Sequence, residues 1–306
     1  MSEPQTALER WREHMRGRVR VFHRGGLMRY LAILGPGIIA AVAGDDAGGI
    51  ATYASAGAQY GYATLWVIVV ITVCLLIVQE MVTRMGAVTG KGLSDLIRER
   101  FGVRWTAFAM LTLLIANAAT IVSEFAGIAA ALELFGVTRY ISVPLSAAML
   151  WWLVTKGSYR RVERVFLLMT TAFLAYIISA FLARPDWGQV ARNTVIPSIT
   201  PDSAYLVLIM ALIGTTITPY MQIFQQSAIV DKGVTVQDYS AARADMMTGV
   251  FLANVIAYSI IIATAATLYV HGIQIETAAD AAIALEPLAG SYAKILFAIG
   301  LFGAST

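Results

Sequence analysis

Charged residues are scarce in this chain. They make up 13% of its 306 residues, whereas an ordinary soluble domain carries about a quarter. Hydrophobic residues make up 58%, and the mean hydropathy is +0.70. This composition excludes a soluble domain and indicates an integral membrane protein. The apolar runs are long and lack the alternating pattern of outer-membrane strands, so we predict an all-α protein.

Cysteine and histidine are scarce as well. The one cysteine, Cys74, excludes an internal disulfide and a cysteine-based metal site. The three histidines, His14, His23 and His271, lie in the expected tail or in a loop. The sequence contains no phosphate-binding glycine loop, no HExxH motif and no nucleophile paired with a base. We therefore predict that the protein is not an enzyme and has no cofactor.

Hydropathy and helix-breaking residues predict eight membrane segments. They lie at about 32–57, 63–83, 105–135, 140–156, 162–183, 203–231, 246–270 and 291 to the end. The last apolar run stops at Thr306 without a flanking charge or a tail. We therefore expect a C-terminally truncated piece of a longer protein, with a tail over residues 1–31 and a membrane domain over 32–306.

The basic residues are distributed unevenly between the two sides of the membrane. Residues 1–31 contain seven arginines and no lysine. Over alternate loops, the side of the N-terminus carries eighteen lysines and arginines and the other side four. Because such residues concentrate in cytoplasmic loops, the N-terminus is predicted to be cytoplasmic, and we expect a prokaryotic plasma membrane. The pI of about 9.0 reflects these loops rather than nucleic-acid binding.

The first apolar segment is interrupted by two adjacent carboxylates, Asp45 and Asp46, among glycines at 44, 48 and 49. Two such charges and the helix-weakening glycines would together cost about 8 kcal/mol at the centre of a membrane span. An interrupted helix exposes backbone carbonyls and a half-helix dipole, from which many transporters build ion sites. The break therefore predicts an ion site. An intramembrane aspartyl protease is disfavoured, because its two aspartates would come from separate helices.

The sixth apolar segment contains a second interruption, Thr215-Thr216-Ile217-Thr218-Pro219-Tyr220. Proline removes a backbone donor and frees a carbonyl one turn earlier. Two broken helices five spans apart run in opposite directions, as expected for an inverted repeat whose breaks face a shared site. We predict a first repeat over about 32–183 and an incomplete second repeat over about 203–306.

After the second break, polar residues recur on one helix face at Thr218, Gln222, Gln225 and Gln226. Such a stripe is expected to line a polar pathway. The alternative is that the glutamines only form hydrogen bonds between helices, because buried amides also hold membrane helices together.

The third segment places Asn117, Thr120 and Glu124 on one face. An intramembrane carboxylate is a candidate proton carrier or part of an ion path. The alternative is a neutral, hydrogen-bonded glutamate that braces the first helix.

Three stretches resemble one family. "GPGIIAAVAGDDAGGIATYASAGAQYGYATLW", "GKGLSDLIRERFG" and "TTITPYMQIFQQSAIVDKG" are similar to the Nramp family of divalent metal transporters, and specifically to its branch of Nramp-related magnesium transporters. The resemblance covers essentially the whole chain after the tail. It implies a LeuT-type fold with discontinuous first and sixth helices, and alternating-access transport of a divalent metal ion.

Departures from the commoner family pattern carry the prediction about the ion. Manganese and iron transporters of the family have Asp-Pro-Gly-Asn in helix one, where this chain has Asp46-Ala47-Gly48-Gly49. Their Met-Pro-His in helix six corresponds to Thr218-Pro219-Tyr220. The amide ligand and the soft sulfur ligand are therefore absent, and Mg²⁺ is usually held by one or two carboxylates and retained waters. We expect Mg²⁺ uptake, with Mn²⁺ also admitted.

The resemblance also bears on proton coupling. At the positions of the family's proton path the chain has Ile121, Glu124, Tyr220 and Gln225, so only the glutamate is kept. We therefore predict uncoupled transport, driven by the ion gradient and the membrane potential. The alternative is a proton-coupled Mn²⁺ or Fe²⁺ symporter in which Glu124 alone carries the proton. Further alternatives are a non-transporting scaffold or sensor, and a permease of similar fold for organic cations or amino acids.

The predicted metal site follows from these positions. Asp46 is the first choice for direct charge pairing and Asp45 the second. The remaining candidates are the backbone carbonyls of Ala43 and Thr215, the Thr218 hydroxyl, and Tyr220 and Gln222 as contacts to retained waters. Pathway or proton candidates are Glu124, Gln225 and Gln226. The metal ion and the lipid bilayer are the only expected partners.

Overall fold

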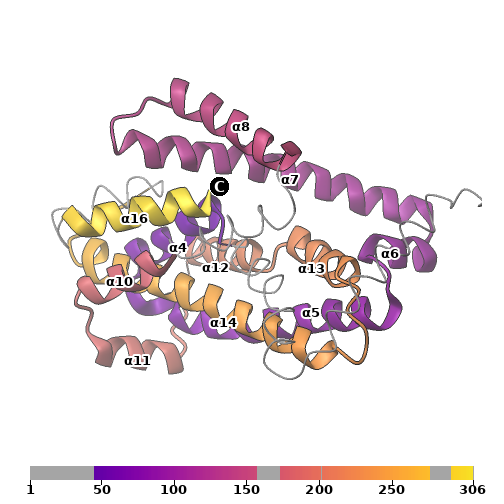
Figure 1. The fold of residues 1–306 in the computed structure, drawn as a ribbon. Helices are drawn as coiled ribbons and strands as arrows, with labels where there is room; N and C mark the ends of the chain where they lie inside the picture. The colour runs from indigo at the N-terminus through magenta and orange to yellow at the C-terminus, as the bar shows by residue number, and fades with distance from the viewer. Residues whose placement is uncertain (1–44, 157–172, 201, 276–290, 306) are drawn as a thin grey trace, which may run out of the picture.

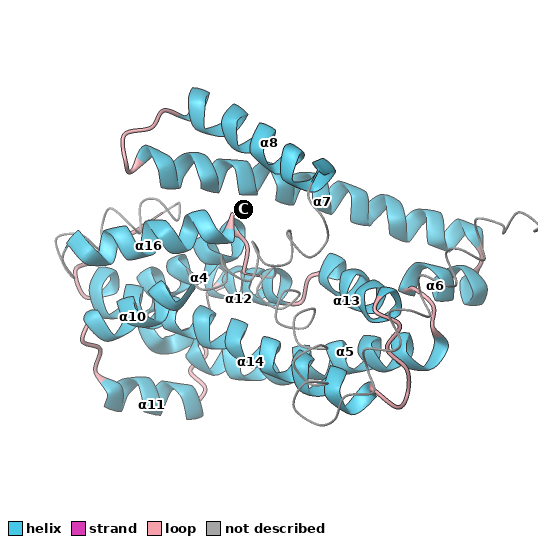
Figure 2. Cartoon of the chain, viewed as in Figure 1, coloured by secondary structure: helices cyan, strands magenta, loops and turns pink. Residues whose placement is uncertain are grey.

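The computed structural model describes residues 45–156, 173–200, 202–275 and 291–305, and every regular element in these ranges is a helix (Figures 1 and 2). The elements, labelled as in Figure 1, are α4 (Ala47–Tyr60), η2 (Gly61–Thr64), α5 (Leu65–Thr89), α6 (Leu93–Phe101), α7 (Val103–Glu133), α8 (Arg139–Lys156), α10 (Leu174–Leu182), α11 (Trp187–Val195), α12 (Ser203–Thr216), α13 (Pro219–Asp231), α14 (Tyr239–Thr264), η4 (Ala265–Tyr269) and α16 (Ser291–Ala304).

Helix α4 lies at the centre of this bundle, where it contacts α7, α12, α14 and α16. Its side chains Ile50, Tyr53 and Ala54 are completely buried. Helices α7 and α8 pack together along one side, and α14 lies along the other side against α4, α5 and α10 (Figure 1). At the start of this helix, Asp45 and Ala47 are buried and Asp46 is partly buried.

Small residues allow α4 to approach its neighbours closely. A Cβ atom on Gly57 would lie 2.0 Å from Thr264 Oγ1 of α14. On the other side, a Cβ atom on Gly127 of α7 would lie 2.6 Å from the Cβ of Ala47. Membrane helices associate through such small-residue contacts because lipid supplies no hydrophobic drive between them.

Four helical stretches among the described residues are long and apolar enough to cross a membrane. They are Ala47–Thr89, Val103–Glu133, Ser203–Asp231 and Tyr239–Tyr269. The helix that contains the predicted span 246–270 starts earlier than that span, at Tyr239. Its first two turns contain Arg243 and Asp245, which lower the hydropathy but do not oppose helix formation.

Two short helices, α6 and α11, are absent from the predicted spans because they are polar on average. Hydropathy alone does not predict them. Of the first predicted span, residues 32–44 lie outside the described residues, and of the fifth only 173–182 are described as helical.

The second predicted break is confirmed. Helix α12 ends at Thr216, Thr218 has extended backbone geometry (φ −78°, ψ 140°), and α13 begins at Pro219. Proline is favoured at a first helical position because its missing N–H would have no partner there and its φ suits the helix. The sixth segment is therefore two half-helices that meet at residues 217–218.

Candidate functional site

The site begins at the N-terminus of α4. Asp46 is the N-cap residue, and its Oδ1 accepts a hydrogen bond of 2.5 Å from the Gly49 backbone N–H. A carboxylate here interacts favourably with the positive end of the helix dipole. Asp45 is the more buried of the two, at 3% exposure, and its Oδ2 has no hydrogen-bond partner among the described residues. The two aspartates repel each other electrostatically.

Glu124 approaches the same helix end from α7. Its carboxylate faces the backbone N–H of Ala47 and interacts electrostatically with Asp46. Its Oε2 is buried and has no hydrogen-bond partner in the described part of the chain. The close approach is possible because a Cβ on Gly48 would already lie 3.3 Å from Ser123 Oγ. The carboxylates of Asp46 and Glu124 therefore lie close together at the first turn of α4, and Asp45 lies next to Asp46.

The second break supplies the facing groups. Tyr220, in the first turn of α13, interacts electrostatically with Asp46, Glu124 and Asp45. The Thr218 side chain is buried at 8% exposure. The Thr215 carbonyl would accept its helical hydrogen bond from residue 219, but Pro219 has no N–H. A carbonyl at the negative end of α12 is thereby left available at this break.

The polar stripe on α13 is buried, but its members have different surroundings. Gln222 lies near the break, and neither its Nε2 nor its Oε1 has a hydrogen-bond partner among the described residues. Gln225 donates to Thr83 Oγ1 of α5 at 3.3 Å. The alternative predicted for the stripe, hydrogen bonds between helices, is therefore what the structure has at Gln225.

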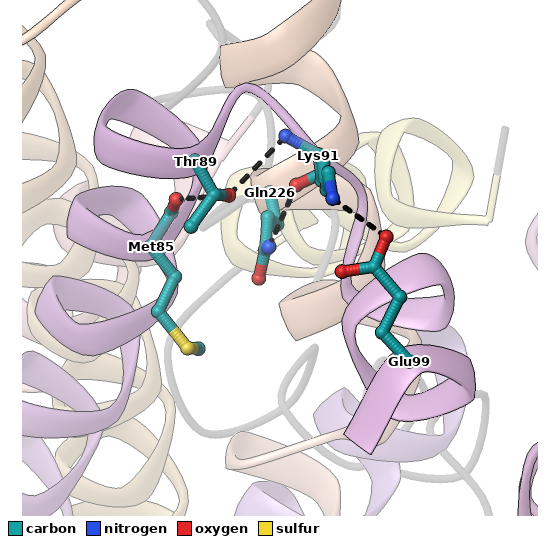
Figure 3. Close-up of polar contacts among 5 residues, drawn as sticks. All are labelled: Met85, Thr89, Lys91, Glu99 and Gln226. Carbon is teal, nitrogen blue, oxygen red and sulfur yellow. Dashed lines mark hydrogen bonds and ion pairs between the residues drawn. The ribbon is translucent and has the colours of Figure 1, made fainter. Parts of the chain in front are cut away.

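Gln226 forms the last contact of the stripe, where its Nε2 donates to the backbone carbonyl of Lys91 at 2.9 Å (Figure 3). Lys91 follows α5, and its Nζ forms an ion pair of 2.6 Å with Glu99 of α6. Thr89 accepts from the Lys91 N–H and donates to the Met85 carbonyl. Gln226 thus attaches α13 to the connection between α5 and α6.

Two buried polar residues near the stripe were not predicted. Gln79 of α5 is completely buried and donates to Met221 Sδ at 2.7 Å, while its Oε1 has no partner among the described residues. Its signal in the sequence is a glutamine that, together with Glu80, interrupts a long apolar run, since polar side chains at membrane depth are costly. Thr83, one turn later, is buried as well and accepts from Gln225.

The third-segment face has the predicted orientation. Asn117, Thr120 and Glu124 are partly buried, whereas Ile121 and Val122 between them are 56% and 70% exposed. Asn117 Oδ1 is buried without a hydrogen-bond partner in the ranges described. The polar face of α7 thus points toward the protein and its apolar face points away.

The described site is rich in oxygen and poor in other metal-binding atoms. No group of three histidine, cysteine, aspartate or glutamate side chains in the described ranges is arranged to hold a metal ion. The structure brings together Asp46, Asp45, Glu124, Thr218 and Tyr220 between the start of α4 and the break that separates α12 from α13. Ala43, which was predicted to offer a carbonyl, lies outside the described residues. A cation here would meet carboxylate, hydroxyl and carbonyl oxygens, which suit hard divalent ions.

Comparisons with known proteins agree with this geometry. The divalent metal cation transporter MntH of Deinococcus radiodurans is 32% identical over 292 residues, covering 90% of this chain and 65% of that protein. MntH of Caldanaerobacter subterraneus is 31% identical over 291 residues, covering 90% of this chain and 68% of that protein. These relatives are named as transporters and not as enzymes.

Solved structures show the same fold. A crystal structure of the Eremococcus coleocola manganese transporter matches with a TM-score of 0.76 at 22% identity, covering 92% of this chain and 64% of that one. The chain thus spans less than two thirds of the Deinococcus and Eremococcus proteins. The predicted all-α, LeuT-type membrane fold is confirmed, while the division into repeats stays a prediction. A family model described as "Natural resistance-associated macrophage protein-like" matches residues 37–306, so this chain belongs to the Nramp family.

Proposed function

We propose that this chain is part of a transporter that moves divalent metal ions across a membrane, and that Mn²⁺ is one of them. The observation that carries the proposal is the convergence of Asp46, Glu124 and Tyr220 where the two interrupted helices meet. The names of the relatives support the ion class, since they are divalent metal and manganese transporters.

Asp46 is the proposed charged ligand. The N-terminal end of α4 favours its ionised form, and the C-terminal end of α12 presents the free Thr215 carbonyl and the adjacent Thr218 hydroxyl. A divalent ion between these ends would also relieve the repulsion of Asp46 by Asp45 and by Glu124. Metal binding is therefore expected to depend most strongly on Asp46, because its negative charge lies directly at the N-terminal end of α4.

Glu124 is the proposed proton carrier. It lies beside Asp46, so a cation bound at Asp46 would favour release of a proton from Glu124. The names of the relatives support Mn²⁺ rather than the Mg²⁺ expected from the sequence, and the proposal of proton coupling rests on Glu124. We retain Mg²⁺ as a second candidate on one observation, the replacement of amide and sulfur ligands by Gly49 and Thr218, which leaves oxygen donors only.

The proposal is tested in proteoliposomes that contain the complete protein. Uptake of Mn²⁺, Mg²⁺ and Ca²⁺ is measured together with internal pH. We expect Mn²⁺ uptake with acidification, loss of uptake in Asp46→Ala, and Mn²⁺ uptake without acidification in Glu124→Gln. Mg²⁺ uptake at unchanged internal pH would instead favour the second candidate. Unchanged uptake in Asp46→Ala would contradict the site for either ion.

A matched control is available at another helix. Asp186 caps α11 in the same way, accepting from the Gly188 and Gln189 backbone N–H groups at 2.9 and 3.2 Å, but it is exposed. Asp186→Ala removes a cap of the same kind away from the breaks. Uptake by this variant is expected to match that of the unmodified protein.

The membrane and the orientation are part of the proposal. The uneven distribution of lysine and arginine supports a cytoplasmic N-terminus in a prokaryotic plasma membrane. Single cysteines introduced at Gly90 and Gly136 in a Cys74→Ser background would test it in intact cells. An impermeant thiol reagent is expected to label position 136 only, and labelling of position 90 instead would reverse the orientation.

A further inference from the structure

A basic and aromatic surface lies where α6 joins α7. We call it the basic patch and define it by Arg98, Arg100 and Arg104 together with Phe101 and Trp105. All five side chains are exposed, and Phe101 and Trp105 are each 64% exposed. Arg98 and Arg100 lie in the last turn of α6, and Arg104 is the second residue of α7. Cationic and aromatic groups are therefore combined at one end of the bundle.

The charge of the patch is not neutralised within the described residues. None of its three arginines forms an ion pair there, whereas the neighbouring carboxylate of Glu99 is already paired with Lys91 at 2.6 Å (Figure 3). Asp95, the other acidic residue of α6, lies in the first turn, where it offsets the helix dipole. Arg98, Arg100 and Arg104 therefore keep their guanidinium groups available for an external anion.

The apolar part of the patch continues along α7. Trp105 and Phe108 form an edge-to-face pair with ring centroids 6.3 Å apart, and Phe108 is 62% exposed. Leu111 and Ile115 extend this exposed surface toward the middle of the helix. Tryptophan is enriched where a membrane span meets the headgroup region, and arginine side chains there extend toward the phosphates.

We propose that the basic patch binds the headgroup of an anionic phospholipid, with the acyl chains lying along the exposed face of α7. Guanidinium groups form paired hydrogen bonds with phosphate oxygens. The aromatic rings provide the apolar contact that a soluble anion would not use. Beside the patch, Lys91, Asp95, Arg98 and Glu99 line a hollow of about 400 Å³ that can take the polar end of such a headgroup. This inference does not depend on which metal the protein transports.

The test is native mass spectrometry of the purified full chain in detergent, titrated with phosphatidylglycerol or phosphatidylcholine. We expect phosphatidylglycerol to be retained about tenfold more strongly. Arg98→Gln/Arg100→Gln/Arg104→Gln is expected to remove this preference, and the corresponding triple lysine variant to keep most of it. Trp105→Ala is expected to weaken both lipids equally, because it removes apolar contact and no charge.

The matched control removes three arginines at the other end of the bundle. Figure 1 shows α10, α11 and the connection from α7 to α8 at the opposite end of the bundle from α6. Arg139 begins α8, Arg184 follows α10 and Arg192 lies in α11. Their triple glutamine variant is expected to retain the preference. The proposal is overturned by equal retention of the two lipids, by equal losses in both triple variants, or by glycerol 3-phosphate competing as well as the lipid. If the first triple variant does not fold, the single variants Arg98→Gln, Arg100→Gln and Arg104→Gln are measured instead. An unchanged lipid preference in all three would also overturn the proposal.

Discussion

The Tyr53 hydroxyl of α4 lies 2.9 Å from Thr216 Oγ1, the last residue of α12. The Thr216 hydroxyl donates its hydrogen to the Leu212 carbonyl at 2.8 Å, so Tyr53 is the donor in the hydrogen bond between Tyr53 and Thr216. Both side chains are buried. This contact joins α4 to the last turn of α12, and it fixes the end of α12 relative to the helix that Asp46 caps.

Because Tyr53 is the donor, removing its hydroxyl and removing the Thr216 hydroxyl should lower the stability by different amounts. Thr216→Val leaves the buried Tyr53 hydroxyl without an acceptor and is expected to cost about 1–3 kcal/mol. Tyr53→Phe removes the donor while Thr216 keeps its bond to Leu212, which is expected to cost about 0.5–1.5 kcal/mol. Chemical denaturation in detergent measures both. The double variant should be less destabilised than the sum, and strict additivity would mean that the hydroxyls do not interact.

Gly57 tests the close packing of α4 on α14. A Cβ there would lie 2.0 Å from Thr264 Oγ1 and 2.5 Å from the Ile261 carbonyl, so backbone as well as side chain must move. Gly57→Ala is expected to lower the stability by about 1–3 kcal/mol. Gly214→Ala is the control, because a Cβ on that helical glycine would have no atom within 4 Å apart from its chain neighbours and the backbone of its own helix. This control substitution should raise the free energy of unfolding by about 0.8–1.0 kcal/mol, and the melting temperature should rise with it.

Asp46 caps α4 and also supplies the negative charge proposed to bind the metal ion, and two substitutions distinguish these roles. Asp46→Asn keeps an oxygen that can accept from the Gly49 N–H, so α4 should keep its cap. Asp46→Ala removes the acceptor and is expected to cost about 1 kcal/mol more. Metal uptake should be lost in both, because both lack the charge. Uptake retained in the asparagine variant would show that the cap and not the charge is what matters.

The sequence was sufficient for features that depend on local chemistry. Pro219 predicts the break that the structure has at residues 217–218, and the spacing of Thr218, Gln222 and Gln225 predicts one buried face. It was insufficient for pairings between distant segments. Nothing in the hydropathy of α4 shows that Tyr53 will meet Thr216, because that contact depends on how α12 packs.

The missed helices have a different cause. Helix α6 is too polar for a membrane span, and hydropathy cannot distinguish a polar surface helix from a loop. The sequence does not show the role of Gln79, because an amide next to Glu80 in a long helix reveals neither its partner nor its depth. Its contact with Met221 is visible only once α5 and α13 are placed side by side.

The glutamines of α13 allow a last prediction, in which stability and transport should separate. Gln226 donates to the Lys91 carbonyl, so Gln226→Leu leaves that contact unmade and is expected to cost about 1 kcal/mol. Gln222 has no partner for either amide atom among the described residues, so Gln222→Leu removes an unsatisfied buried group and should leave stability unchanged or higher.

The same Gln222→Leu variant is expected to lower metal uptake. A buried amide without a partner lowers the stability of the fold, so we expect it to have a functional role, as a contact to the ion or to its waters. Gln226→Leu lies farther from the breaks and should lower uptake only in proportion to the protein that remains folded. Thermal unfolding and proteoliposome uptake on the same preparations measure the two effects. Equal losses of stability in both variants would mean that the stripe only holds helices together, as the alternative from the sequence proposed.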